Sequence, residues 1–316
     1  MGLKVLVTRP VDPCGTDYLA GRGYEVRFAP SWDEETLVRE AADVSGMLVR
    51  NDRITKRIMD AAPKLRVIGR HGVGMELIDL AYAKEKGIRV TNTPIANYTA
   101  VAEHTLGLLL DLAKHARETG LAFYGGDFEI RNRIRNVELA GKTLAVLGLG
   151  KIGRTVARKA VYGLDMKVRA YDPYVGQAEA GSEIAMAASP EEAVAGADFV
   201  TVHLPLTAET RGIVSRELIA AMKDGAYLIN TSRGDTVDEQ AVVEALRSGK
   251  LAGGAFDVLH DEPPAPDHPL FAFPNVILTP HNAAHTAEAF QRMSLHAAMG
   301  IDEVLSGKPV TWEVKL

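Results

Sequence analysis

The chain has 316 residues, 47% of them hydrophobic and 24% charged, and its formal net charge is −5. This length allows two domains, and we see neither an apolar run long enough to cross a bilayer nor a secretory leader. The slightly negative charge provides no global positive field for nucleic acid or an acidic membrane. The single cysteine, Cys14, excludes an internal disulfide, and no Cys/His spacing of the zinc type is present. We expect a cytoplasmic protein with no metal, nucleic-acid partner or membrane partner.

The first part of the chain alternates strand-like and helical runs, which is typical of a parallel sheet flanked by helices. We predict strands at 4–8, 25–28, 46–49, 66–69 and 89–91, which complete one small sheet, and helices at 34–42, 56–61 and 77–86. A long helix is predicted from 98 to 119. Its leucines crowd one broad face, so we expect it to be buried and to join two domains.

The alternation restarts after a polar, arginine-rich link at 128–136. We predict strands at 143–147, 167–171, 199–203, 226–230, 253–257 and 276–279, and a helix at 152–161 after the first of them. These strands form a second, larger sheet. The fold class is therefore α/β, with parallel sheets in both parts.

Gly148, Gly150 and Gly153 form a G-x-G-x-x-G turn between the strand at 143–147 and the helix that follows it. The first glycine allows the tight turn, the second lets the backbone approach a pyrophosphate, and the third lets the helix pack close to the sheet. Asp172 follows the next strand, about 20 residues on, where an acid accepts hydrogen bonds from the adenosine ribose. Residues 173–177 contain no Arg or Lys to meet a 2′-phosphate, so we predict NAD rather than NADP. A turn that merely packs is the weaker interpretation, because strand, turn, helix and acid occur together.

Three further polar residues follow predicted strands, at the edge where open α/β sheets bind ligands. Arg233 is a permanent cation whose fork can grip a carboxylate, although an arginine here can also be a surface salt-bridge partner. His281 can take and return a proton near neutral pH. Glu262, if close, would orient that imidazole and favour its protonated form, whereas alone it would be a solvated acid. Beside a dinucleotide site, these three residues predict hydride transfer at a hydroxy acid.

Five more segments occur in a recognisable order: VTNTP at 90–94, VAEHT at 101–105, GKT at 141–143, HLPLT at 203–207 and GAFDV at 254–258. With the glycine turn and the three polar residues, they make the chain resemble the D-2-hydroxyacid dehydrogenase family, in its phosphoglycerate dehydrogenase-like branch. The resemblance covers nearly the whole chain. Formate dehydrogenase has a similar fold, but there a glutamine pairs with the histidine, so Glu262 argues against it.

The resemblance implies two Rossmann-like, doubly wound domains. Residues 1–98 and 286–316 would form a flavodoxin-like substrate-binding domain, and 99–285 an inserted NAD-binding domain through which homodimers assemble. It implies that backbone N–H groups at Gly72, Val73 and Gly74 hold the substrate carboxylate and that Asp257 holds the nicotinamide carboxamide. Further cofactor contacts are implied at Thr105, Lys151, Ile152, His203, Pro205, Thr210 and Thr231. We expect no regulatory domain and no serine feedback, because the chain ends soon after its last helix.

The substrate side departs from the family pattern. Relatives often read Gly-Val-Gly-x-Asp-Asn-Ile-Asp where this chain has GVGMELID at 72–79, and Arg-Ser where it has Arg50 and Asn51. Arg50 and Arg70 are candidates for binding a second anionic group such as phosphate or sulfonate. The run Arg131, Arg133 and Arg135 is another, although a solvated basic linker is equally favoured there. We expect a phosphoglycerate dehydrogenase-like enzyme. The alternatives are a glyoxylate or hydroxypyruvate reductase and, from another class, an NAD(H)-sensing, corepressor-like binding protein.

Overall fold

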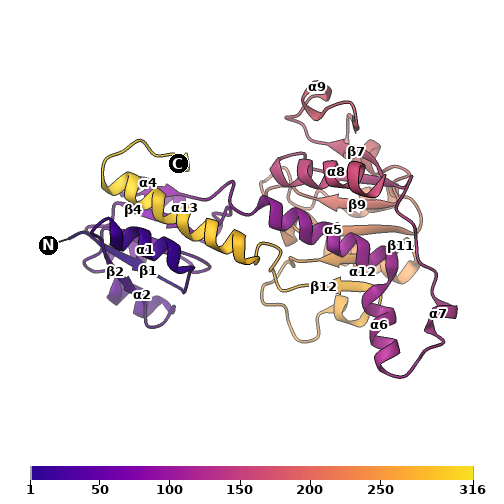
Figure 1. Cartoon of the computed structure of the whole chain (residues 1–316), viewed down its shortest axis with the longest axis horizontal. Helices are drawn as coiled ribbons and strands as arrows, with labels where there is room; N and C mark the ends of the chain where they lie inside the picture. The colour runs from indigo at the N-terminus through magenta and orange to yellow at the C-terminus, as the bar shows by residue number, and fades with distance from the viewer. Residues whose placement is uncertain (1, 316) are drawn as a thin grey trace. The chain divides into compact units, whose positions relative to one another are not determined.

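The computed structural model describes residues 2–315, which divide into two compact units. One unit contains the residues up to Asn97 together with those from His285 onward, and the other is Tyr98–Ala284 (Figure 1). The chain therefore leaves the first unit once and later returns to it. Among residues 2–315, no helix is long and apolar enough to cross a membrane.

The first unit is built on a five-stranded parallel sheet in the order β2-β1-β3-β4-β5. Its strands are β1 (Lys4–Val7), β2 (Glu25–Phe28), β3 (Gly46–Val49), β4 (Val67–Arg70) and β5 (Arg89–Thr91). The five predicted strands are confirmed, and their order is the flavodoxin-like, doubly wound arrangement. Side chains alternate along β1, so that Val5 and Val7 face one layer of helices and Leu6 faces the other.

Helices cover both faces of this sheet. On one face lie α1 (Pro13–Gly21) and α13 (Ala287–Leu305), side by side in Figure 1, and on the other lie α2 (Glu34–Glu40), α3 (Lys56–Asp60) and α4 (Leu80–Glu85). α4 begins at Leu80 rather than at 77, because the Asp79 carboxylate accepts the Tyr82 N–H at 3.0 Å and caps the helix there. The buried Asp302 of α13 accepts hydrogen bonds from the Tyr24 hydroxyl at 2.9 Å and the Lys308 ammonium at 3.0 Å. The bond from Tyr24 ties the returning segment to the N-terminal part of the first unit.

The second unit contains a seven-stranded parallel sheet in the order β12-β11-β10-β9-β6-β7-β8. Its strands are β6 (Thr143–Leu147), β7 (Lys167–Tyr171), β8 (Ile184–Met186), β9 (Phe199–Val202), β10 (Ala226–Asn230), β11 (Leu251–Phe256) and β12 (Val276–Leu278). Six were predicted. The strand β8 was not, because it is a short edge strand in which only Ile184 is buried. The strand order reverses between β6 and β9, the position at which such sheets bind nucleotides.

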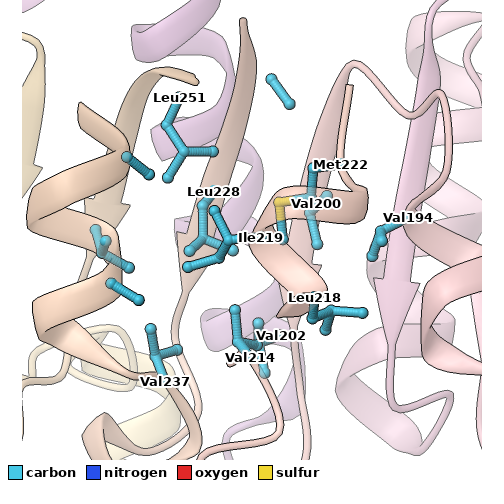
Figure 2. Close-up of a cluster of buried hydrophobic side chains, with 14 of the residues drawn as sticks. Val194, Val200, Val202, Val214, Leu218, Ile219, Met222, Leu228, Val237 and Leu251 are labelled. Atoms are coloured by element: carbon cyan, nitrogen blue, oxygen red, sulfur yellow. The ribbon is translucent and has the colours of Figure 1, made fainter. Parts of the chain in front are cut away.

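Two layers of helices enclose the larger sheet. On one face lie α5 (Tyr98–Lys114) and α8 (Lys151–Leu164), and on the other lie α10 (Pro190–Val194), α11 (Arg216–Ala221) and α12 (Glu239–Ser248). Figure 2 shows the second layer, where Leu218 and Ile219 of α11 and Met222, which follows the helix, pack against the sheet that carries Val200 and Leu228. The shorter elements are α6 (Ala116–Tyr124), α7 (Ile130–Arg133), α9 (Gln177–Ala180) and the 3-10 turns η1 (Gly234–Thr236) and η2 (Pro269–Ala272).

The prediction of one helix from 98 to 119 is wrong, because the helix breaks at His115. This residue has a left-handed backbone with φ 46°, and α6 begins at the next position, where the Asp111 carboxylate accepts the Arg117 N–H at 2.7 Å. No glycine or proline occurs between 108 and 119 to indicate the break. The predicted link at 128–136 likewise contains a helical turn, α7.

Candidate active site

The glycine turn connects β6 to α8 at the reversal of the strand order. Gly148 has φ 93°, and a Cβ there would lie 2.7 Å from a carbonyl oxygen in the loop after β9. At Gly153 a Cβ would lie 1.9 Å from the Gly148 carbonyl oxygen, so only glycine lets α8 start this close to the turn. Gly150 caps α8, and Lys151 and Ile152 belong to its first turn, whose N–H groups suit a pyrophosphate.

Asp172 follows β7 and lies beside the glycine turn. Its Oδ2 accepts the Leu149 N–H at 2.8 Å, and its Oδ1 accepts the Tyr174 N–H at 2.9 Å. Each oxygen is held in place and keeps a lone pair that a ribose hydroxyl can reach. The negative charge at this position opposes a 2′-phosphate.

The loops after β9 and β10 bring further predicted cofactor residues to the same edge of the sheet. The Thr210 hydroxyl donates to the Pro205 carbonyl at 2.5 Å and closes the β9 loop. Burial lowers the pKa of His203 to about 3, so this imidazole is neutral, and its Nε2 lies 3.0 Å from a threonine hydroxyl of β9. The hydroxyls of Thr231 and Thr105 lie 2.9 Å apart, which joins the β10 loop to α5.

Arg233 follows β10 and stands immediately before η1. Asn230 Nδ2 donates to the Arg233 carbonyl at 2.9 Å, and Arg233 Nη1 donates to the preceding carbonyl at 2.7 Å. At Gly234 a Cβ would lie 2.0 Å from the Leu259 carbonyl oxygen. Only glycine therefore allows the arginine loop to lie this close to the loop that carries Glu262.

His281 and Glu262 are in direct contact. His281 Nδ1 donates to Glu262 Oε2 at 2.7 Å, and Glu262 Oε1 accepts the Leu259 N–H at 3.2 Å. Burial raises the pKa of Glu262, but the hydrogen bond and charge of His281, the Leu259 N–H and the charge of Arg233 together hold this pKa below its usual value. Glu262 is therefore an anion at neutral pH, and it fixes the ring so that Nε2 is left for a substrate. Arg233, Glu262 and His281 gather beyond the carboxyl ends of the neighbouring strands β10, β11 and β12.

Asp257, at the end of β11, holds the loop that carries His281. Its buried carboxylate accepts the Thr279 hydroxyl at 2.6 Å, the Asn282 N–H at 2.9 Å and the Ala283 N–H at 2.9 Å. Its carbonyl accepts the His281 N–H at 2.8 Å. His281 has a left-handed backbone with φ 50°, which a residue other than glycine adopts only where its surroundings impose it. Most of the hydrogen-bonding capacity of Asp257 thus serves the loop, and Oδ2 keeps one lone pair for a carboxamide.

The predicted substrate-binding loop lies in the first unit, after β4. Gly72 has φ 135°, and its N–H donates to the Thr93 hydroxyl at 3.0 Å. The N–H groups of Val73 and Gly74 are therefore the remaining candidates for binding the substrate carboxylate. Arg70 Nε donates to the Gly74 carbonyl at 3.0 Å, and its guanidinium also donates to the carbonyl that precedes Gly72. Arg70 therefore braces the loop, a role that the sequence did not indicate.

Arg50 follows β3 at the same edge of the smaller sheet. Its guanidinium lies 4.8 Å from the centroid of the Phe290 ring, and burial and the charge of Arg9 lower the pKa of Arg50. Burial, followed by the charges of Arg50 and Arg70, lowers the pKa of the neighbouring His71 to about 4. Arg9 pairs with the buried Asp52 carboxylate at 2.6 Å, and the charge of Arg50 leaves this edge suited to a further negatively charged group.

The arginine run at 131–135 lies in the second unit, at the opposite edge of its sheet from the predicted triplet. Arg131 stacks on Phe128 at 4.1 Å, and Arg133 pairs with an aspartate. The run includes α7, which contacts α6, and Arg117 of α6 donates to a carbonyl at the amino end of β12. These placements favour the solvated linker over a substrate role within the same chain.

Comparison with known proteins identifies the family to which the chain belongs. The family model for D-isomer specific 2-hydroxyacid dehydrogenase, NAD binding domain, matches residues 106–283. The chain belongs to this family. D-3-phosphoglycerate dehydrogenase from Methanocaldococcus jannaschii is 40% identical over 308 residues, covering 97% of this chain and 58% of that enzyme. The chain thus spans little more than half the length of the curated relatives that it matches.

Two solved structures are similar to this chain over nearly its whole length. The TT0316 protein from Thermus thermophilus has a TM-score of 0.92 at 36% identity, covering 99% of this chain and 100% of its own. The NADPH-dependent glyoxylate/hydroxypyruvate reductase from Sinorhizobium meliloti has a TM-score of 0.88 at 28% identity, covering 99% and 97%. The predicted family, fold class and NAD cofactor are confirmed. Across residues 2–315, no group of three or more His, Cys, Asp or Glu side chains is arranged to hold a metal ion.

Three residues at this site were not predicted from the sequence. Gly234 is needed for the close contact between two loops, and Thr279 and His104 lie beside Asp257, with His104 Nε2 at 3.2 Å from the Thr279 hydroxyl. His104 lies in the VAEHT segment and Thr279 directly after β12, so both stood in segments already singled out. Their partners are distant in sequence, and nothing local indicates such contacts.

Proposed function

We propose that this protein is an NAD-dependent D-2-hydroxyacid dehydrogenase of the phosphoglycerate dehydrogenase type, which transfers hydride between C2 of a small 2-hydroxy or 2-oxo acid and nicotinamide. The observation that carries the proposal is the contact of 2.7 Å between His281 Nδ1 and Glu262 Oε2. The contact joins the loops that follow β11 and β12, and Arg233 follows the neighbouring strand β10. The glycine turn lies at the same edge of the sheet, where the strands have their carboxyl ends. The site therefore combines an oriented proton carrier, a fixed cation and a nucleotide-binding turn.

Each residue has a separate task in this mechanism. Bound NAD would supply the hydride acceptor for C2 of the hydroxy acid. Arg233 binds the carboxylate and the C2 oxygen, and its charge favours the transition state as that oxygen changes its protonation. His281 Nε2 takes the hydroxyl proton during oxidation and returns it during reduction, while Glu262 stabilises the protonated ring. Reduction is accordingly favoured at lower pH and oxidation at higher pH.

The residues that would hold NAD fit it. Gly148, Gly150 and Gly153 leave room for the pyrophosphate at the start of α8, where a Cβ on the first or third glycine would collide with backbone. The carboxylate of Asp172, positioned by two N–H groups, suits the ribose hydroxyls and opposes the additional phosphate of NADP.

For the substrate, we propose an acid with a second anionic group, such as 3-phosphoglycerate and its oxo form, recognised by Arg50. The half-buried guanidinium of Arg50, whose pKa is lowered by burial and by the charge of Arg9, supports an anion there. The likeness to the Sinorhizobium meliloti reductase supports the alternative, a glyoxylate or hydroxypyruvate reductase.

NADH consumption with phosphohydroxypyruvate and with hydroxypyruvate, at equal low concentrations, tests both readings. Preference for the phosphorylated acid supports phosphoglycerate dehydrogenase, and turnover of hydroxypyruvate or glyoxylate alone supports the reductase. No turnover with any 2-oxo acid contradicts both and leaves the corepressor-like sensor. Arg50→Met should raise KM for the phosphorylated acid by about tenfold or more, as for the loss of a charged hydrogen bond. The matched control is Arg53→Met, at an exposed arginine of the same loop, which should leave KM unchanged.

The proposal includes a homodimer formed through the second unit, in the cytoplasm. Exposed apolar side chains gather on α6 and the turn after it, at Leu121, Phe123, Tyr124 and Phe128, and such patches mark protein interfaces. Replacing Phe123 and Tyr124 together by Asp should give a monomer in sedimentation equilibrium. Phe271→Asp, at an exposed phenylalanine elsewhere in the unit, should leave the dimer intact, and a dimer that survives the double change would contradict this interface.

A further inference from the structure

We infer that His104 of α5 is a positioning residue for His281, acting through the Thr279 hydroxyl and the Asp257 carboxylate on the loop at 279–283. The inference rests on the proposed function, because it concerns the orientation of the proposed proton carrier. All four residues belong to the second unit. Nothing in the reaction requires His104 to touch substrate or cofactor.

The loop at 279–283 makes four hydrogen bonds to Asp257. Asp257 accepts a hydroxyl and two N–H groups of the loop through its carboxylate, and the His281 N–H through its carbonyl. The carboxylate is 1% exposed, so water does not compete for these bonds. Because His281 is held in the left-handed region, any loosening of these bonds lets its backbone relax and turns the ring away from its working direction.

The direction of the hydrogen bonds makes His104 the first donor in the series from His104 through Thr279 to Asp257. A carboxylate only accepts, so the Thr279 hydroxyl must donate its single proton to Asp257 Oδ1, at 2.6 Å. The same hydroxyl oxygen lies 3.2 Å from His104 Nε2 and can then only accept, which makes His104 the donor and places a proton on Nε2.

His104 thereby sets the rotamer of Thr279. A threonine hydroxyl that accepts from His104 and donates to Asp257 has one orientation, and the Asp257 oxygen that receives it also receives the Asn282 N–H. Without the His104 donor, the hydroxyl can rotate away from Asp257 and the loop loses one of its four hydrogen bonds to Asp257. The cost falls on the geometry of His281, and therefore on kcat rather than on the binding of NADH.

Two conservative changes break the chain of contacts at different points. His104→Phe keeps an aromatic ring but removes the donor, and Thr279→Val keeps the side-chain shape but removes the hydroxyl. We expect each to lower kcat for reduction by about tenfold and to leave the Kd of NADH within about twofold. The double variant should be no slower than the slower single variant, because either change alone already interrupts the hydrogen bonds that link His104 to Asp257. His104→Gln and Thr279→Ser, which keep a donor and a hydroxyl, should recover most of the rate.

A readout without substrate or cofactor completes the test. In NMR spectra of the protein alone, the ring signals of His281 should broaden or divide in His104→Phe and return to a single set in His104→Gln. Full activity in His104→Phe, multiplicative losses in the double variant, or a glutamine variant no better than the phenylalanine one would overturn the inference. If the unmodified protein turns over no 2-oxo acid, the proposed function fails. The NMR result then tests the inference by itself: altered His281 signals in His104→Phe support the positioning role of His104, and unchanged signals overturn it.

Discussion

Glu262→Gln tests the proposed proton chemistry most directly. The variant keeps the side-chain volume and an oxygen that can accept from His281 Nδ1, but it removes the negative charge. For reduction, His281 must begin as the protonated ring, which the carboxylate 2.7 Å away stabilises. Without that charge the protonated ring lacks the partner that stabilises it. The pH above which the reduction rate declines should therefore move toward acid.

The exposure of the pair sets the size of the effect. The side chains of His281 and Glu262 are 51% and 38% exposed, so water screens them and the large figures for buried pairs do not apply. An exposed ion pair contributes about 0.2–1 kcal/mol, and one pH unit corresponds to about 1.4 kcal/mol. The hydrogen bond that remains in the glutamine variant limits the loss further. We therefore expect a displacement of about 0.5 pH unit, and of no more than about one unit.

The assay is kcat/KM for NADH-dependent reduction of hydroxypyruvate from about pH 5 to about pH 9, because this parameter reports groups of the free enzyme. Asp261→Asn is the matched control, since it removes a negative charge from the same loop at an exposed position next to Glu262. Its profile should coincide with that of the unmodified protein. A Glu262→Gln profile that does not move, or an equal displacement in the control, would refute the reasoning.

Three further changes have expected outcomes. Gly234→Ala places a Cβ 2.0 Å from the Leu259 carbonyl oxygen, so it should push the two catalytic loops apart and lower kcat by about 100-fold, measured by steady-state kinetics, with NADH binding retained. Asp302→Asn should lower the free energy of unfolding in urea by about 2–4 kcal/mol at neutral pH. Burial raises the pKa of Asp302, but hydrogen bonds from Lys308 and a tyrosine lower it overall, so this stability exists above the unfolded-state pKa and the gap between the two proteins should close as pH falls below about 4. Asp172→Ser should reduce the preference for NADH over NADPH by about tenfold or more, and an unchanged ratio of kcat/KM values would remove Asp172 from cofactor selection.

Residues that follow strands could be placed from the sequence. Parallel strands end at a common edge, so Arg233, Glu262 and His281 were expected near one another once their strands were predicted. The contact between Glu262 and His281 has this origin, and so does the proximity of Asp172 to the glycine turn. The family, the fold class and the cofactor followed from the same segments.

Features that depend on distant backbone could not be predicted. The break at His115 has no glycine or proline, and β8 is too short for its alternation to be seen. Arg70 was expected to meet an anion, and the structure adds hydrogen bonds from its guanidinium to two carbonyl groups of the loop that follows it. An arginine donates equally well to a carbonyl or to an anion, so only the fold of the loop decides between them.

The residues proposed for catalysis and those proposed for substrate recognition belong largely to different units. Arg233, Glu262, His281 and the glycine turn all belong to Tyr98–Ala284, whereas Arg50 and the loop at 72–74 belong to the other unit. A change of preferred acid therefore needs no alteration of the groups that move the proton. Exchanging both parts of the first unit, residues 2–97 and 285–315, with those of a relative that uses a different acid is a route by which such a chimera acquires a new substrate with its redox chemistry intact.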